Sequence, residues 1–239
     1  MQAINNSNDL NIIIEEFKAF MGIKYMPNID FVYRSVGDLD LNKKINSLAQ
    51  YEFENKKHII YLLNDFKSAN FYKSIIFHEL THCLDTYLYQ DEFEIGFLKW
   101  YKEYHAGQVE LLKSLGVKSI QDNVDFEMNT QVDTLLEFKT VRSILQSYLE
   151  DLNSIIGELN LNNATEILNM LFIYLGKKSI CSMYAADFNE NDLDERNLIK
   201  SSIGYLFPAI NKIFIGFMEP DAIKKSQNLA KLFYAKLIS

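Results

Sequence analysis

The chain contains little proline, glycine and cysteine. Three prolines and nine glycines are spread over its 239 residues, and they form no Ser/Gly/Pro-rich linker between folded parts. The length then allows one large domain or two small ones. The two cysteines, Cys83 and Cys181, are too few for a disulfide framework and fit a reducing compartment. We expect both to be small, buried, apolar side chains.

Basic charge and long apolar runs are also scarce. The chain has 24 Lys and Arg against 32 Asp and Glu, a net charge of −8, which argues against a nucleic-acid partner. The most apolar late stretch, residues 203–218, is interrupted by Pro208, Asn211 and Lys212, so it predicts a buried helix and no membrane span. The first eight residues carry no signal-peptide pattern. We therefore expect a cytoplasmic protein, with leaderless export and the oligomeric state left open.

Hydrophobic residues make up 48% of the chain, and 13% of all residues are aromatic. This composition predicts a globular protein with a sizeable core. Near the start, apolar residues recur at helical spacing over residues 8–20, and alternation at residues 29–33 predicts a strand. Two β-prone runs, residues 49–54 and 58–63, flank a short polar turn and predict a hairpin. The hairpin leads directly towards the stretch with the clearest chemical signature.

That stretch is His78-Glu79-Leu80-Thr81-His82, in a chain with only four histidines. On a helix, residues four apart lie on one face, so His78 and His82 can both offer a ring nitrogen to one Zn²⁺. Glu79 lies one residue round, where its carboxylate can reach a metal-bound water without being a ligand. The motif predicts a zinc site with Glu79 as general base. The alternative is a surface helix with two unrelated histidines.

The helix around the motif is predicted over residues 69–88, with one face for the core and one for the metal. At about 100° per residue, the core face gathers Ile76, Leu80, Cys83 and Tyr87, and the metal face gathers Phe71, Ile75, His78, His82 and Asp85. Asp85 is either an acceptor that fixes a histidine tautomer or a solvated carboxylate near the helix end.

A second helix, preceded by a capping-box spacing at residues 91–94 and followed by Gly116, is predicted to end at Leu115. A catalytic zinc usually has a third protein ligand, and this helix offers Glu103, His105 and Glu110. Glu103 and Glu110 share one face, whereas His105 points about 160° away from Glu103. His105 is then an ordinary surface residue or a donor to the reaction's oxyanion.

The pattern His-Glu-x-x-His-x-x-Asp at residues 78–85, followed by Glu-x-x-Ala at residues 103–106, resembles the gluzincin-type metallopeptidases. The resemblance implies a zincin-type fold with Glu103 as the third ligand. Glu110 is the next candidate ligand, an outer partner that orients a ligand, or an exposed carboxylate. The similarity covers roughly residues 50–115 and is close in outline to the lethal-factor-like and ImmA-like peptidases. The glycine and third histidine of metzincins do not follow His82, and the thermolysin-like Asn-Glu-x-x-Ser-Asp form is absent.

These features predict a zinc-dependent peptidase that binds one Zn²⁺ per chain and acts on a peptide or protein substrate. Either His105 or one of the 14 tyrosines would stabilise the oxyanion. An edge strand beside the metal would pair with the extended substrate, and we assign this role to Ile59, Ile60 and Tyr61. His58 is expected to be a surface strand residue. The alternative function is a catalytically inactive zincin-like protein that regulates or binds a partner.

The remaining chain is predicted to be helical, which makes the fold class α+β, mostly helical, with a small antiparallel or mixed sheet beside the motif helix. The predicted helices cover residues 126–159, as one long helix or a broken pair, 164–188 with a possible break at Gly176, 197–217, and 222–238, with Pro220 at the start of this last helix. The acidic stretch at residues 189–195 lacks the alternating ligands and central glycine of a calcium-binding EF-hand loop, so we expect a solvated loop there. We expect a zincin-like core over residues 1–118 and a helical subdomain over residues 119–239 packed on it, or one continuous domain.

Overall fold

A computed structural model gives the arrangement of the chain. It describes residues 7–34, 48–63, 70–91, 95–134, 137–158, 163–200, 204 and 220–238. Helices dominate this part of the chain, and its strands form one mixed three-stranded sheet and one two-stranded sheet. The predicted fold class, α+β and mostly helical, is confirmed. None of the described helices is both long and apolar enough to cross a membrane.

The three-stranded sheet is built from β1 (Ile29–Arg34), β2 (Ala49–Glu54) and β3 (Lys57–Leu63), in the order β1-β3-β2. β3 pairs in parallel with β1 and antiparallel with β2. The predicted hairpin of β2 and β3 is confirmed, and its two turn residues, Asn55 and Lys56, have φ angles of 50° and 63°. Two such residues in succession match the twist of a tight hairpin.

The strand order corrects the predicted substrate strand. Ile59, Ile60 and Tyr61 lie in the central strand β3, where Ile60 pairs with both Phe31 and Tyr51. A strand bonded on both sides has no free row of backbone groups for an added peptide, so the prediction that β3 is the edge strand was wrong. The described edge strands of this sheet are β1 and β2, and β2 packs against the motif helix.

The motif helix α2 (Asn70–Tyr89) follows the sheet, and α3 (Ile95–Ser114) follows it. Both ends of α2 and the C-terminal end of α3 differ from the predicted positions by one residue. α2 is covered on one side by α1 (Ser7–Met21), where the Phe77 ring meets Phe17 and Phe20 edge-to-face at centroid distances of 5.2 and 5.4 Å. The core face is confirmed except at Tyr87, which is 46% exposed.

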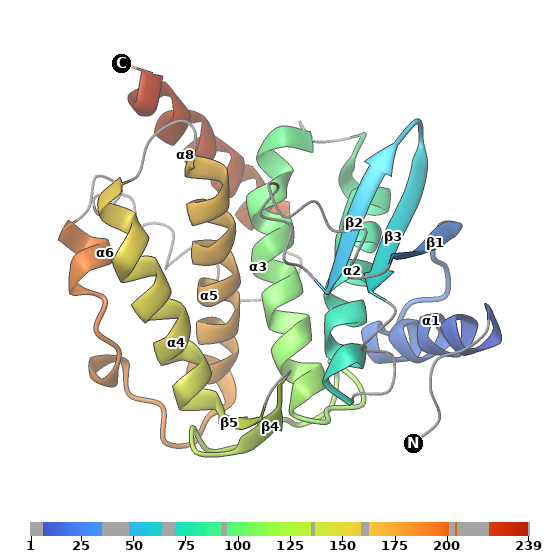
Figure 1. Cartoon of the computed structure of the whole chain (residues 1–239), viewed down its shortest axis with the longest axis horizontal. Helices are drawn as coiled ribbons and strands as arrows, with labels where there is room; N and C mark the ends of the chain where they lie inside the picture. The colour runs from blue at the N-terminus through green and yellow to red at the C-terminus, as the bar shows by residue number, and fades with distance from the viewer. Residues whose placement is uncertain are drawn as a thin grey trace.

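Beyond α3, the helices α5 (Ala164–Tyr184) and α4 (Val141–Ile155) follow side by side, so that α2, α3, α5 and α4 form a row across the molecule (Figure 1). α5 continues through Gly176, so the predicted break there was wrong. A Cβ atom at Gly176 would lie 2.1 Å from the carbonyl oxygen of Tyr104 in α3. The glycine marks a close approach of two helices, which a side chain would prevent.

The predicted helix over residues 126–159 was wrong in its first half. Phe126 forms an isolated bridge with Ala185, and β4 (Gln131–Asp133) and β5 (Phe138–Thr140) form a two-stranded sheet. α4 begins only at Val141, where the hydroxyl of Thr140 accepts a hydrogen bond from the backbone N–H of Ser143 at 3.1 Å. Because this side chain satisfies a free N–H of the first turn, Thr140 ends the extended segment and starts the helix. A short 3₁₀ helix, η3 (Ile156–Glu158), continues from α4.

The chain after α5 contains a 3₁₀ turn, η4 (Glu190–Asp192), a short helix, α6 (Arg196–Lys200), and α8 (Pro220–Ile238). The start of the last helix at Pro220 is confirmed. Most of the predicted helix over residues 197–217, and most of the late apolar stretch over residues 203–218, lie outside the described residues. Cys83 and Cys181 are both buried and free of disulfides, as predicted. Buried apolar residues from α1 to α8 form one hydrophobic cluster.

Candidate metal centre

Three side chains from α2 and α3 converge on one point. The ring nitrogens of His78 and His82 and a carboxylate oxygen of Glu103 lie within 4.8 Å of one another. Oε2 of Glu103 is 3.6 Å from Nε2 of His78 and 3.4 Å from Nε2 of His82. This group could hold a metal ion. It is the set that the motif and the gluzincin resemblance predict, and α3 supplies its third member by lying against α2.

The helical spacing explains how the two imidazoles share one target. His78 and His82 are one turn apart, and their rings meet edge-to-face with centroids 4.7 Å apart. Both rings are buried, and so is Glu79 between them. Two imidazoles and a carboxylate in a nearly dry setting are the donor types that zinc takes in catalytic sites, with a fourth position open. The donor set therefore fits a divalent metal ion.

In the metal-free site, His78 and the carboxylates around it stabilise each other's charged forms. Burial alone would lower the pKa of His78, but hydrogen bonds to Glu103 and Glu110 raise it to about 10. Burial raises the pKa of Glu103, and the nearby His82 and His78 overcome this effect and hold that pKa far below its usual range. A positive charge is thus favoured where a metal ion would lie.

Glu110 holds His78 from the side away from Glu103. Its Oε2 accepts a hydrogen bond from Nδ1 of His78 at 3.0 Å, and its Oε1 pairs with Nζ of Lys177 at 2.7 Å. Lys177 comes from α5 and is only 3% exposed. Burial raises the pKa of Glu110, but Lys177 and His78 bring it down to about 2. A charged acceptor on the second ring nitrogen fixes the tautomer and orientation of a metal-binding histidine.

Glu79 lies beside the group and is held by the sheet. Its Oε2 accepts a hydrogen bond from the backbone N–H of Tyr51 in β2 at 2.7 Å. Burial raises the pKa of Glu79, while the two histidines and the Tyr51 N–H partly lower it again. A carboxylate with a raised pKa next to a metal site is suited to accept and return a proton near neutral pH.

Asp85 and His105 pair with each other and not with the predicted ligands. Nδ1 of His105 lies 2.9 and 3.0 Å from the two carboxylate oxygens of Asp85, and both side chains are 0% exposed. The alternatives that placed Asp85 in solvent and His105 on the surface were therefore wrong. His58 is also buried, with Nδ1 2.8 Å from the hydroxyl of Tyr51, so the surface interpretation of His58 was wrong as well.

Two residues beside the site come from the helical second half, and the sequence interpretation did not name either. Lys177 lies in an apolar helical run, and a buried lysine needs a carboxylate partner. This signal marks Lys177, while the structure identifies Glu110 as the partner. Tyr148 in α4 has its pKa raised by burial and by the carboxylates of Glu110 and Glu103. Tyr148 and Glu110 also line one cavity, so α4 lies near the outer partner of His78. No sequence pattern singled out Tyr148 among the tyrosines.

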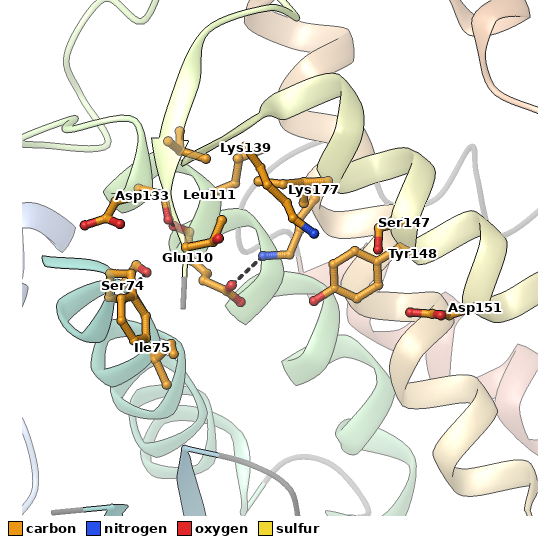
Figure 2. Close-up of a pocket in the computed structure, with 15 residues that line it drawn as sticks. Ser74, Ile75, Glu110, Leu111, Asp133, Lys139, Ser147, Tyr148, Asp151 and Lys177 are labelled. Carbon is orange, nitrogen blue, oxygen red and sulfur yellow. Dashed lines mark hydrogen bonds and ion pairs between the residues drawn. The ribbon is translucent and has the colours of Figure 1, made fainter. Parts of the chain in front are cut away.

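A cavity of about 420 Å³ adjoins the centre and includes Glu110, Lys177 and Tyr148 in its lining. Residues of α2, α3, β4, β5, α4 and α5 surround it, and Figure 2 shows the Lys177–Glu110 ion pair on its wall. His78 itself is separated from the lining by the Glu110 carboxylate that it contacts. Glu110 therefore links the two, because it lines the cavity and also contacts the ring of His78.

No protein-family model, curated protein or solved structure matches the chain. Function is therefore inferred from the residues of the site, namely the spacing of His78 and His82, the placement of Glu103, and the position of Glu79 against β2.

Proposed function

We propose that the chain is a zinc-dependent peptidase in which Glu79 is the general base. The observation that carries the proposal is the convergence of His78, His82 and Glu103, with the Glu79 carboxylate held beside them by the Tyr51 N–H. A purely structural metal site has no need of a buried, unligated carboxylate at this place. The arrangement of three ligands and one base matches the requirements of metal-assisted hydrolysis.

The protein residues divide the reaction among them. Zinc, when bound, would supply a Lewis acid that polarises the substrate carbonyl and lowers the pKa of a water molecule. Glu79 takes the proton of the attacking water and returns it to the leaving amine. Glu110 keeps the His78 ring oriented by accepting from its Nδ1–H, because a carboxylate can only accept.

The edge of β2 is where an extended substrate would bind. Backbone groups of an antiparallel strand point alternately towards and away from the partner strand. The N–H of Tyr51 points away from β3, because it reaches Glu79. The N–H and C=O of Phe53, two residues on, point the same way. A peptide that adds to this edge would run beside the metal group, with affinity from its own backbone.

Tyr148 is the residue that we propose as donor to the oxyanion. It lines the cavity together with Glu110, and the carboxylates of Glu110 and Glu103 are near enough to raise the pKa of its hydroxyl. A phenol with a raised pKa stays protonated and keeps its O–H available for donation. His105 is committed to Asp85 in the core.

Three variants test the proposal together with the wild type: His78→Ala, Glu79→Gln, and Glu150→Gln as a matched control on the exposed side of α4. Metal content by elemental analysis and cleavage of a broad peptide library are measured on each. We expect zinc loss in His78→Ala, retained zinc without cleavage in Glu79→Gln, and unchanged behaviour in the control. Stoichiometric zinc in a wild type that cleaves no peptide would favour the inactive regulatory alternative.

A further inference from the structure

The cavity next to Glu110 has a chemical preference that the metal group does not determine. Its walls combine apolar side chains with the two ammonium groups of Lys139 and Lys177. We propose that this cavity is a specificity pocket that receives an acidic side chain, Glu or Asp, of a peptide substrate. This inference rests on the proposed peptidase function, and it adds the class of residue that the substrate carries near the cleaved bond.

The position of the cavity relative to the metal group supports the assignment. Ile75 lines the cavity and lies one helical turn before His78 on the same face of α2. Glu110 lines it as well and lies two turns after Glu103 on α3. The cavity therefore begins one residue layer away from the ligands. A peptide bound with its carbonyl at the metal would have a neighbouring side chain within reach of this space.

The two lysines differ in how far their charges are already used. Lys177 is buried and paired with Glu110 at 2.7 Å. Lys139 is 37% exposed, and its ion pair with Glu137 is long, 3.8 Å, to a carboxylate that is 65% exposed. Such an exposed ion pair contributes little free energy, so the ammonium group of Lys139 can still pair with the carboxylate of a ligand. Figure 2 shows the ammonium groups of both lysines directed into the cavity.

The acidic residues of the lining are placed less favourably for a basic ligand. The carboxylate of Asp133 is directed away from Lys139 and Lys177, and Asp151 lies beyond the ring of Tyr148 (Figure 2). Glu110 is paired with Lys177, and this pair carries no net charge. The lining as a whole has three carboxylates and two ammonium groups. The ammonium group of Lys139, with only a long and exposed ion pair to Glu137, is the cavity charge that is least compensated. Apolar side chains complete the wall and would contact the methylene groups of a glutamate: Phe71, Ile75, Leu111, Val132 and Ile144.

The test uses zinc-loaded protein and peptide sets that differ only in having Glu, Lys, Leu or Phe at one position, scanned along the peptide. At one position next to the cleaved bond, we expect wild type to have a kcat/KM about fivefold higher with Glu than with Lys. Lys139→Glu should reverse that order, and Lys139→Gln should remove most of the difference. Lys118→Glu makes the same charge change at an exposed residue outside this cavity and should keep the wild-type order.

The proposal is overturned if wild type prefers Leu or Phe at every position, or if Lys139→Glu keeps the wild-type order. A binding measurement separates this result from failure of the peptidase proposal. Titration of the same peptides into zinc-loaded Glu79→Gln should show tighter binding of the Glu peptide, again reversed by Lys139→Glu. Binding with this order and no cleavage by wild type would retain the acidic pocket and reject hydrolysis. Binding without any preference would reject the pocket.

Discussion

The backbone N–H of Tyr51 donates a hydrogen bond to Oε2 of Glu79 over 2.7 Å. This contact ties the edge of the small sheet to the residue that follows the first histidine of the motif. The carboxylate is buried, so a backbone donor both orients it and stabilises its charged form. Strand β2 thus positions the proposed base and carries the edge at which we propose that the substrate binds.

Replacement of Tyr51 by proline removes this N–H, while Tyr51→Ala removes the same side chain and keeps the N–H. Proline is tolerated at edge-strand positions whose N–H does not join the ladder. We expect Tyr51→Pro to have a kcat about tenfold or more below that of Tyr51→Ala, because a hydrogen bond to a charged group is worth about 1.5–3 kcal/mol. Zinc content should be equal in the two variants.

The pH dependence of kcat/KM is a second test of the contact between Tyr51 and Glu79. Loss of the donor removes an interaction that lowers the pKa of Glu79. The acidic limb of kcat/KM should therefore move to higher pH in Tyr51→Pro than in Tyr51→Ala. Equal rates and superimposed pH profiles would show that the Tyr51 N–H has no part in positioning the base.

Lys177 should influence zinc binding through Glu110. Lys177→Met leaves the Glu110 carboxylate with His78 as its remaining partner among the described contacts, and we expect zinc affinity to fall about tenfold, as for other outer partners of metal ligands. In a Glu110→Gln background, the same replacement should cause little further loss. Lys177→Arg should restore most of the affinity.

The neighbouring lysine supplies the control for this cycle. Lys178 is equally buried but pairs with Glu195 and Glu190, away from the metal group. Lys178→Met should lower the thermal stability and leave the zinc dissociation constant unchanged. If Lys177→Met weakens zinc binding equally with and without Glu110, Lys177 does not act through that carboxylate.

Zinc binding should release about one proton from His78 at pH 8. The pKa of His78 is raised to about 10 in the metal-free site, so the ring is protonated at pH 8 and must lose its proton to bind metal. The same shift adds stability to the metal-free protein below the unfolded pKa of about 6.5, and this stability is lost as the pH rises through about 10. Calorimetry in buffers of different ionisation enthalpy measures the release.

Glu110→Gln removes one of the carboxylates that raise the pKa of His78 and should reduce the number of protons released at pH 8. Release should fall towards zero for wild type as the pH is raised above 10. Equal release from wild type and Glu110→Gln at pH 8 would contradict the assignment of the proton to the His78–Glu110 pair.

Tyr148→Phe tests the proposed oxyanion donor. Loss of one such donor costs about 10²–10³ in kcat in other hydrolases, and we expect a fall of that order with unchanged zinc content. Tyr87→Phe removes a hydroxyl from an exposed ring and should keep full activity. A Tyr148→Phe variant with wild-type kcat would assign the oxyanion to another group.

The local features of the site could be predicted from the sequence because they depend on helical periodicity. The i, i+4 spacing of His78 and His82 and the face of α3 that carries Glu103 are properties of single helices. The bounds of α2 and α3 follow from the same apolar pattern, interrupted by turn residues. The packing of α2 against α3 is the one further step, and it follows if residues of both helices bind the same metal ion.

The features that the sequence did not reveal depend on contacts between distant segments. The order β1-β3-β2 comes from pairing across a long connection, so the edge strand was misassigned to β3. Helical periodicity places Asp85 on the metal face of α2. In the structure, however, its carboxylate pairs with His105 of α3. Lys177 reaches Glu110 only because α5 packs on α3. Burial of these charged groups follows from tertiary packing, and composition does not show it.

The packing of α5 on α3 makes a last prediction about Gly176. Alanine would favour the helix itself, but its Cβ would meet the carbonyl oxygen of Tyr104 at 2.1 Å and the backbone nitrogen of Gln108 at 3.2 Å. Because backbone atoms cannot move aside cheaply, we expect Gly176→Ala to lower the free energy of unfolding by about 1–3 kcal/mol. Since Tyr104 follows Glu103, the shift of α3 should weaken zinc binding too. Gly157→Ala, with nothing within 4 Å of its Cβ, should leave both unchanged. Chemical denaturation and zinc titration of the two variants measure both effects, and a Gly176→Ala protein as stable as wild type would show that the helices can separate without cost.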